Sequence, residues 1–128
     1  MLKEKVDKLV DKYLDEVISI RRHIHQNPEL SLKEFETSKF VANELRKIGL
    51  EAQEGVGKTG VVSNLNLGKG EKTLMLRADM DALPIQEETG LPFSSKNPGV
   101  MHACGHDIHT SILLGVTKVL NEIKDEIN

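Results

Sequence analysis

Aromatic residues are scarce in this sequence, and their scarcity excludes one class of binding surface. The 128 residues include no tryptophan, one tyrosine and three phenylalanines, so aromatic residues make up 3% of the chain. This set is too small to form a platform on which successive nucleic-acid bases could stack. Aliphatic side chains must therefore provide most of the core packing, and a chain of this length suits one domain.

Neither charge sign dominates, and long apolar runs are missing. Seventeen Lys and Arg residues against 20 Asp and Glu residues give a formal net charge of -3, without a basic tract that would attract a phosphate backbone. No apolar stretch approaches the roughly 20 residues that a membrane-spanning helix needs. Residues 1–5 also lack the apolar segment of a secretory signal. We expect a soluble cytoplasmic protein that binds neither nucleic acid nor membrane.

Only one cysteine, Cys104, is present, so an internal disulfide is excluded. The thiol of Cys104 is therefore free, a metal ligand or a reactive nucleophile. All three alternatives fit a reducing compartment.

Two helices are predicted in the first part of the chain. Apolar residues recur every three or four positions over residues 2–25, which predicts an amphipathic helix, and Pro28 follows its end. Ser31 and Glu34 have the spacing of a capping box, so a second helix is expected to begin at Ser31. Gly49 is expected to end this second helix.

The second part of the chain predicts strands, a loop and a last helix. Residues 61–67 and the apolar run 73–76 are expected to be strands joined by a turn at 68–71, with 73–76 buried on both faces. Residues 82–100, which contain three prolines, predict a long loop. A last helix is expected from about 107 to 127, and its predicted apolar stripe consists of Ile112, Leu113, Val116, Val119, Leu120 and Ile123. The fold class is α/β, with a sheet that needs more chain to be complete.

The residues with the most distinctive chemistry lie between Met101 and His109, where three histidines, one cysteine and one aspartate occur within nine positions. Cys104 and His106 are two apart, a spacing that points them to one side only on an extended backbone. A ligand pair here is expected to lie in a loop, with Gly105 allowing the backbone to bend. Thiolate and imidazole suit zinc, and manganese, cobalt or nickel are alternatives.

The other histidines and acids have more than one interpretation. His102 and His109 are expected to support the site or the structure rather than bind metal. Asp107 is either the N-cap of the last helix or a support of the metal site. The cluster at residues 21–25 is expected to have a packing or surface role.

Two carboxylates follow the predicted strand 73–76. Asp79 and Asp81 share one face of an extended chain, and Arg77 is able to pair with either of them. One interpretation is a solvated strand end. The other is that one carboxylate orients a metal-bound histidine or water.

Four stretches together resemble the M20 family of metallopeptidases and amidohydrolases. They are RRHIHQNPELS at 21–31, LRADMDALPI at 76–85, ETGLPF at 88–93 and PGVMHACGHD at 98–107. The likeness is greatest to the subgroup of hippurate hydrolases and N-acyl-amino-acid amidohydrolases. It implies a fold that is the N-terminal part of a zinc-peptidase-like catalytic domain, with helices packed on a mixed sheet.

This resemblance also implies a site and a reaction. Cys104 and His106 correspond to two of the five ligands of a site for two divalent ions, which are Mn, Zn, Co or Ni. Asp81 corresponds to the active-site carboxylate, whereas Asp79 replaces a ligand histidine. The implied reaction is metal-dependent hydrolysis of the amide bond of small-molecule N-acyl amino acids. Two divalent ions would lower the pKa of a bridging water in the complete enzyme.

Several parts of the family's machinery are not found in residues 1–128, which are expected to be the N-terminal portion of the catalytic domain. They are the paired glutamates that supply the general base, further histidine ligands, and the smaller dimerisation or lid domain through which family members often form homodimers. The acids Glu87 and Glu88 come before Cys104 and do not match that pair. The chain alone is therefore expected to be inactive.

Two other functions remain open at this point. One is a cysteine amidase with Cys104 as its nucleophile. The other is a non-catalytic truncated paralogue or metal-binding module.

Overall fold

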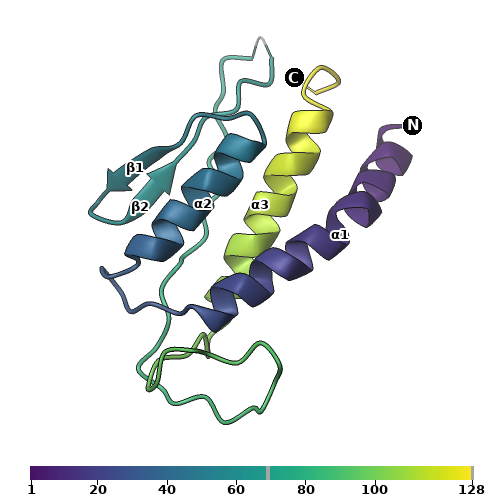
Figure 1. Ribbon diagram of the computed structural model, residues 1–128. Coiled ribbons are helices and arrows are strands. Elements are labelled where there is room, and N and C mark those ends of the chain that lie inside the picture. The colour runs from purple at the N-terminus through teal and green to yellow at the C-terminus, as the bar shows by residue number, and fades with distance from the viewer. Residues whose placement is uncertain (69, 128) are drawn as a thin grey trace.

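Three helices and one short hairpin follow one another in the computed structural model, which describes residues 1–68 and 70–127. The helices are α1 (Leu2–Gln26), α2 (Phe35–Lys47) and α3 (His106–Glu122), and strands β1 (Gln53–Val56) and β2 (Gly60–Val62) pair antiparallel. Figure 1 shows α1 and α3 side by side, with the hairpin beside α2 on the side away from α1. No helix in the described part of the chain is long and apolar enough to cross a membrane.

Helices α1 and α3 run antiparallel, so the last turn of α1 lies beside the first turn of α3 (Figure 1). Lys118 Nζ of α3 donates to Glu16 Oε1 of α1 at 2.6 Å. Gly115 allows the two backbones to approach closely, because a Cβ at this position would lie only 2.8 Å from Val17 Cγ2. This packing brings together residues that are more than 80 positions apart in the sequence.

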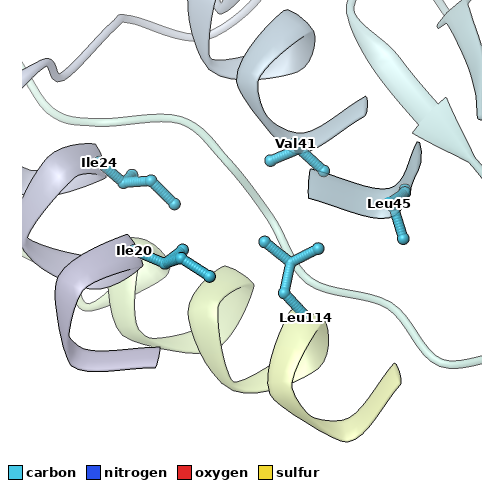
Figure 2. Packing of buried hydrophobic residues seen from close by; sticks show 5 residues of the cluster. All are labelled: Ile20, Ile24, Val41, Leu45 and Leu114. Atoms are coloured by element: carbon cyan, nitrogen blue, oxygen red, sulfur yellow. The ribbon is translucent and has the colours of Figure 1, made fainter. Parts of the chain in front are cut away.

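The core lies where the three helices meet. Its buried members come from α1, α2 and α3 and point toward one another in Figure 2: Ile20, Ile24, Val41, Leu45 and Leu114. Burying an aliphatic side chain of this size stabilises the fold by about 1.5–3 kcal/mol. The amphipathic pattern over residues 2–25 therefore predicted both the existence of α1 and part of the face that it buries.

The apolar stripe predicted for α3 is only partly correct. Ile123 is buried as expected, but 52% of Ile112 is exposed and Val116 is also exposed, whereas Leu114 is 3% exposed. The contact with α1 uses the face of α3 that carries Gly115 and Asp107. A small residue there permits close approach and Asp107 finds polar partners on α1, so Ile112 and Val116 of the predicted stripe remain exposed.

The predicted start of α2 at Ser31 is wrong, because the helix begins four residues later. Leu32 has a φ of +62°, which a right-handed helix cannot contain. Glu34 does not form the expected capping box with Ser31, and its Oε1 accepts a hydrogen bond from the amide of Leu32 instead. Glu29 provides the cap, since its Oε1 accepts from the amide of Thr37 at 2.6 Å.

The end of α2 agrees with the prediction. Gly49 follows the helix with a φ of +95°, and its amide donates to the carbonyl of Arg46. This left-handed residue closes the helix as expected.

The strand predicted at 61–67 is present only at residues 61–62, as part of β2, and the strand predicted at 73–76 is absent from the described residues. The only sheet within residues 1–68 and 70–127 is the β1–β2 hairpin, so residues 73–76 form no strand, and Leu74 and Met75 are each 82% exposed. A strand needs a neighbour to accept and donate its backbone hydrogen bonds, and the described residues provide none for this segment. The turn predicted at 68–71 includes Lys69, which lies outside the described residues. Loop 82–100 is irregular, as predicted.

Candidate metal centre

His106 and Asp81 are in direct contact. His106 is the first residue of α3, and its Nδ1 lies 2.9 Å from Asp81 Oδ1 and 3.0 Å from the backbone carbonyl of Asp81. Both atoms only accept hydrogen bonds, so Nδ1 must carry the proton. The other ring nitrogen, Nε2, then keeps its lone pair. An imidazole held in this way by a carboxylate is the form in which histidine binds a metal.

Asp79 lies near the same imidazole but does not hold it. Its Oδ2 is 4.0 Å from His106 Nε2, and the other carboxylate oxygen accepts a hydrogen bond from Arg77. The backbone carbonyl of Asp79 accepts from Thr110 Oγ1 at 2.8 Å, which fixes the segment before Asp81 against α3. The structure thus places Asp81, rather than Asp79, in hydrogen-bond contact with His106.

Cys104 is exposed and lies two residues before α3. Gly105 between Cys104 and His106 has a φ of +110°, a conformation that costs little only for glycine, so the predicted bend at this position is confirmed. The expectation that both candidate ligands lie in a loop is correct only for Cys104, because His106 opens the helix.

A buried polar network adjoins this centre, and the sequence did not predict it. Asp107 is 1% exposed, and its Oδ2 accepts from Arg21 Nε at 2.9 Å and lies 2.8 Å from His25 Nδ1. The N-cap interpretation of Asp107 is wrong, since Gly105 occupies the cap position. The packing or surface role expected for residues 21–25 did not include these polar contacts of Arg21 and His25. Their four-residue spacing, which puts both on one face of α1, is the signal that could have identified them.

The network continues into loop 82–100 through Glu87. His25 Nε2 lies 3.0 Å from Glu87 Oε1, the same oxygen that accepts from the amide of Ser95 at 2.9 Å. Burial raises the pKa of Glu87, but hydrogen bonds from Thr89, Ser95 and His25 outweigh burial and lower the pKa to about 2. Glu87 is therefore an ionised carboxylate whose oxygens accept hydrogen bonds from these partners.

The remaining histidines differ in their surroundings. His102 is buried, neither of its ring nitrogens has a hydrogen-bond partner among the described residues, and burial lowers its pKa to about 4. His109 is exposed, with its ring centroid 6.2 Å from that of His106. His23 points away from His25 and stacks on Phe40 at a centroid distance of 4.1 Å.

The donor atoms present fit part of a metal site. A thiolate and a carboxylate-oriented imidazole are ligands that zinc and related divalent ions accept. Within residues 1–68 and 70–127, however, no three His, Cys, Asp or Glu side chains are placed so that they could hold a metal ion together. The described residues therefore contain no complete metal site.

Comparisons with known proteins connect this geometry to a family. Residues 75–128 match the model of peptidase family M20/M25/M40. Thermostable carboxypeptidase 2 of Saccharolobus solfataricus is 53% identical over 128 residues, which cover 99% of this chain and 33% of that protein. The N-acyl-L-amino acid amidohydrolase of Geobacillus stearothermophilus is 47% identical over 127 residues, which cover 99% of this chain and 34% of that protein. The chain spans about a third of the length of these relatives.

A solved structure supports the same assignment. A Bacillus subtilis protein, described as a dinuclear metal-binding peptidase from the M20 family, superimposes with a TM-score of 0.86 at 41% identity. The superposition covers 91% of this chain and 33% of the other, so the helices and the small hairpin are an incomplete domain. Sequence and fold agree: residues 75–128 match the M20 family model, and the chain is similar in fold to part of an M20 peptidase.

Proposed function

We propose that this chain contributes Cys104 and His106 as two metal ligands to a hydrolase that uses two divalent ions to cleave the amide bond of N-acyl amino acids. Asp81 is the carboxylate that orients His106. The observation that carries the proposal is the 2.9 Å contact between His106 Nδ1 and Asp81, which leaves Nε2 for a metal. Cys104, two positions before His106 in the sequence, is exposed. The names of the two relatives, a carboxypeptidase and an amidohydrolase, both describe cleavage of an amide bond.

Each of the three residues has a separate task. Asp81 accepts a hydrogen bond from the Nδ1–H group and so fixes the tautomer and direction of the His106 ring. Cys104 offers an anionic sulfur once its proton is lost, and Gly105 bends the backbone between the two donors. Bound divalent ions supply the polarisation of the scissile carbonyl and the lowered pKa of a water nucleophile.

The general base is the part of the reaction that this chain does not supply. A base must accept a proton near neutral pH, and Glu87, with its pKa near 2 and its bonds to His25 and Ser95, is a poor acceptor. We therefore infer that the 128-residue chain does not turn over substrate alone. Residues 1–128 act as one portion of the catalytic domain, and the remaining ligands and the base come from other parts of the enzyme.

The substrate class is tested with a panel of N-acetyl and N-benzoyl amino acids, including hippurate, and with dipeptides. Two proteins are compared, each with Mn²⁺, Zn²⁺, Co²⁺ or Ni²⁺: the 128-residue chain, and the product obtained when the coding sequence is read beyond codon 128. The expected result is no turnover by the chain and chelator-sensitive hydrolysis by the longer product. Cys104→Ala should abolish that hydrolysis.

Two results would replace this proposal. Turnover by the chain that resists chelators and is abolished by a thiol alkylator would show a cysteine amidase. An inert longer product with every metal and every substrate, or a stop codon directly after Asn128, would favour a non-catalytic metal-binding module.

A further inference from the structure

His25 connects three parts of the fold that lie far apart in the sequence. It comes from the last turn of α1, its Nδ1 lies 2.8 Å from Asp107 Oδ2 in α3, and its Nε2 lies 3.0 Å from Glu87 Oε1 in loop 82–100. Only 3% of the His25 side chain is exposed. Both ring nitrogens are therefore engaged inside the protein, away from competing water.

The two contacts determine the protons that His25 carries. Ionised carboxylates only accept hydrogen bonds, so each ring nitrogen must donate to its partner. The ring of His25 lies between Asp107 and Glu87, and Arg21 donates to the same Asp107 oxygen. These four polar side chains form one cluster where α1, α3 and loop 82–100 meet. Removal of the imidazole would leave two buried carboxylates short of a donor, which is the costly state for a buried charge.

Asp107 links these contacts to His106, the candidate ligand that precedes it in α3. Its Oδ1 is buried without a partner in the part of the chain that the structure describes. The carboxylate is therefore held only through Oδ2, by Arg21 and His25. Asp107 and His106 are neighbours in the first turn of α3. That turn is consequently held to α1 through Asp107 and to Asp81 through His106.

The ring of His25 cannot easily rotate out of this position. Glu87 is itself held by the amide of Ser95 and the hydroxyl of Thr89. The ring of Phe93, from the same loop, lies edge-on to His25 at a centroid distance of 5.6 Å, with Arg21 5.0 Å from the Phe93 ring. Loop 82–100 thus encloses the imidazole on the side opposite Asp107.

We propose that His25 is a positioning residue of the metal centre, which acts through Asp107 to hold the first turn of α3 so that His106 points its Nε2 toward the metal. This inference rests on the proposed function, because it takes Cys104 and His106 as ligands. Removal of an interaction that orients a ligand typically lowers metal affinity by about tenfold to a hundredfold. His25 acts one residue further away, so we expect a loss of about tenfold.

The test is a titration of the 128-residue chain with Co²⁺, followed by the absorption of the cobalt–thiolate bond. His25→Ala should weaken Co²⁺ binding about tenfold and reduce this absorption at saturation. His25→Gln retains an N–H that can donate to one carboxylate, and it should lie between His25→Ala and the wild type. Co²⁺ binding of each variant is measured under conditions in which circular dichroism shows that the variant is folded. If His25→Ala does not fold, His25→Gln alone tests the positioning role.

Two controls separate positioning from simple stability. His23→Ala changes an exposed histidine two positions away and should bind Co²⁺ like the wild type. Leu45→Ala removes a core side chain of α2 and should lower stability while the folded protein keeps its Co²⁺ affinity. Equal loss of affinity in Leu45→Ala and His25→Ala would overturn the positioning role, as would wild-type affinity in both His25 variants. Absence of Cys104-dependent Co²⁺ binding in the wild type would instead overturn the proposed function, and this inference with it.

Discussion

His106 Nδ1 and Asp81 Oδ1 lie 2.9 Å apart although 25 positions separate the two residues. The contact joins the first turn of α3 to the segment that precedes loop 82–100. Because the carboxylate accepts a hydrogen bond from the Nδ1–H group, the imidazole presents its other nitrogen as a ligand. The chemistry proposed for this chain depends on this pair more than on any other contact.

Removal of the Asp81 carboxylate should weaken metal binding without unfolding the chain. Asp81→Ala leaves His106 without its acceptor, so Zn²⁺ affinity measured by calorimetry should fall about tenfold to a hundredfold. Asp81→Asn keeps an acceptor oxygen and should lose less. Asp7→Ala changes an exposed aspartate in α1 that pairs with Lys3, and it serves as the control. Equal Zn²⁺ affinity in Asp81→Ala and wild type would refute the orienting role.

Metal should protect the thiol of Cys104. The side chain is exposed and is the only thiol of the chain, so iodoacetamide modifies a single site. A zinc-bound thiolate reacts more slowly because its lone pair is engaged by the metal. Mass spectrometry should therefore show slower alkylation when Zn²⁺ is added and faster alkylation again after chelation. In His106→Ala the protection should be lost, and protection that persisted there would argue against a shared site.

The Glu87 carboxylate should stabilise the fold in a pH-dependent way. Its pKa is lowered from 4.5 to about 2 in the folded chain, because hydrogen bonds to Thr89, Ser95 and His25 outweigh burial. The folded state then binds its proton less readily than the unfolded state. The stabilisation is fully present above pH 4.5 and is lost as the pH falls through 2.

Comparison with Glu87→Gln isolates this effect from the other acids. The difference in the free energy of unfolding between wild type and variant, from urea denaturation, should be largest near pH 6 and shrink between about pH 4.5 and 2. A constant difference across this range would show that the charge of Glu87 contributes nothing.

Two substitutions on α3 test which face of the helix is buried. Leu114 is 3% exposed and packs against α1 and α2, so Leu114→Ala should lower the free energy of unfolding by about 3 kcal/mol. Ile112→Ala, at a position that is 52% exposed, should change it by less than about 0.5 kcal/mol. Urea denaturation measures both, and a reversed order would restore the face predicted from the sequence.

Local patterns predicted much of the architecture correctly. The apolar spacing over residues 2–25, the proline-rich loop 82–100, and the turns at Gly49 and Gly105 all depend on neighbouring residues, so the sequence contains the information. The same holds for the choice of Cys104 and His106, whose chemistry is visible without a fold. The choice of Asp81 as the orienting carboxylate required the family resemblance, and its contact with His106 came from the structure.

Other features depended on contacts between distant segments. The true cap of α2 is Glu29, because the chain folds back after a left-handed residue at Leu32. Residues 73–76 have the composition of a buried strand, but composition cannot supply the neighbouring strand that pairing requires.

The sequence by itself determined the helices, the loop and the candidate ligands, because helix periodicity, turn chemistry and side-chain type act over a few neighbouring residues. The tertiary structure alone decided that His25 and Arg21 hold Asp107 and that α3 buries Leu114 rather than Ile112. These outcomes follow from which faces meet when α1 and α3 pack antiparallel. Close packing at Gly115 and the need of a buried carboxylate for donors set that choice, and both act across about 80 or more positions of the chain.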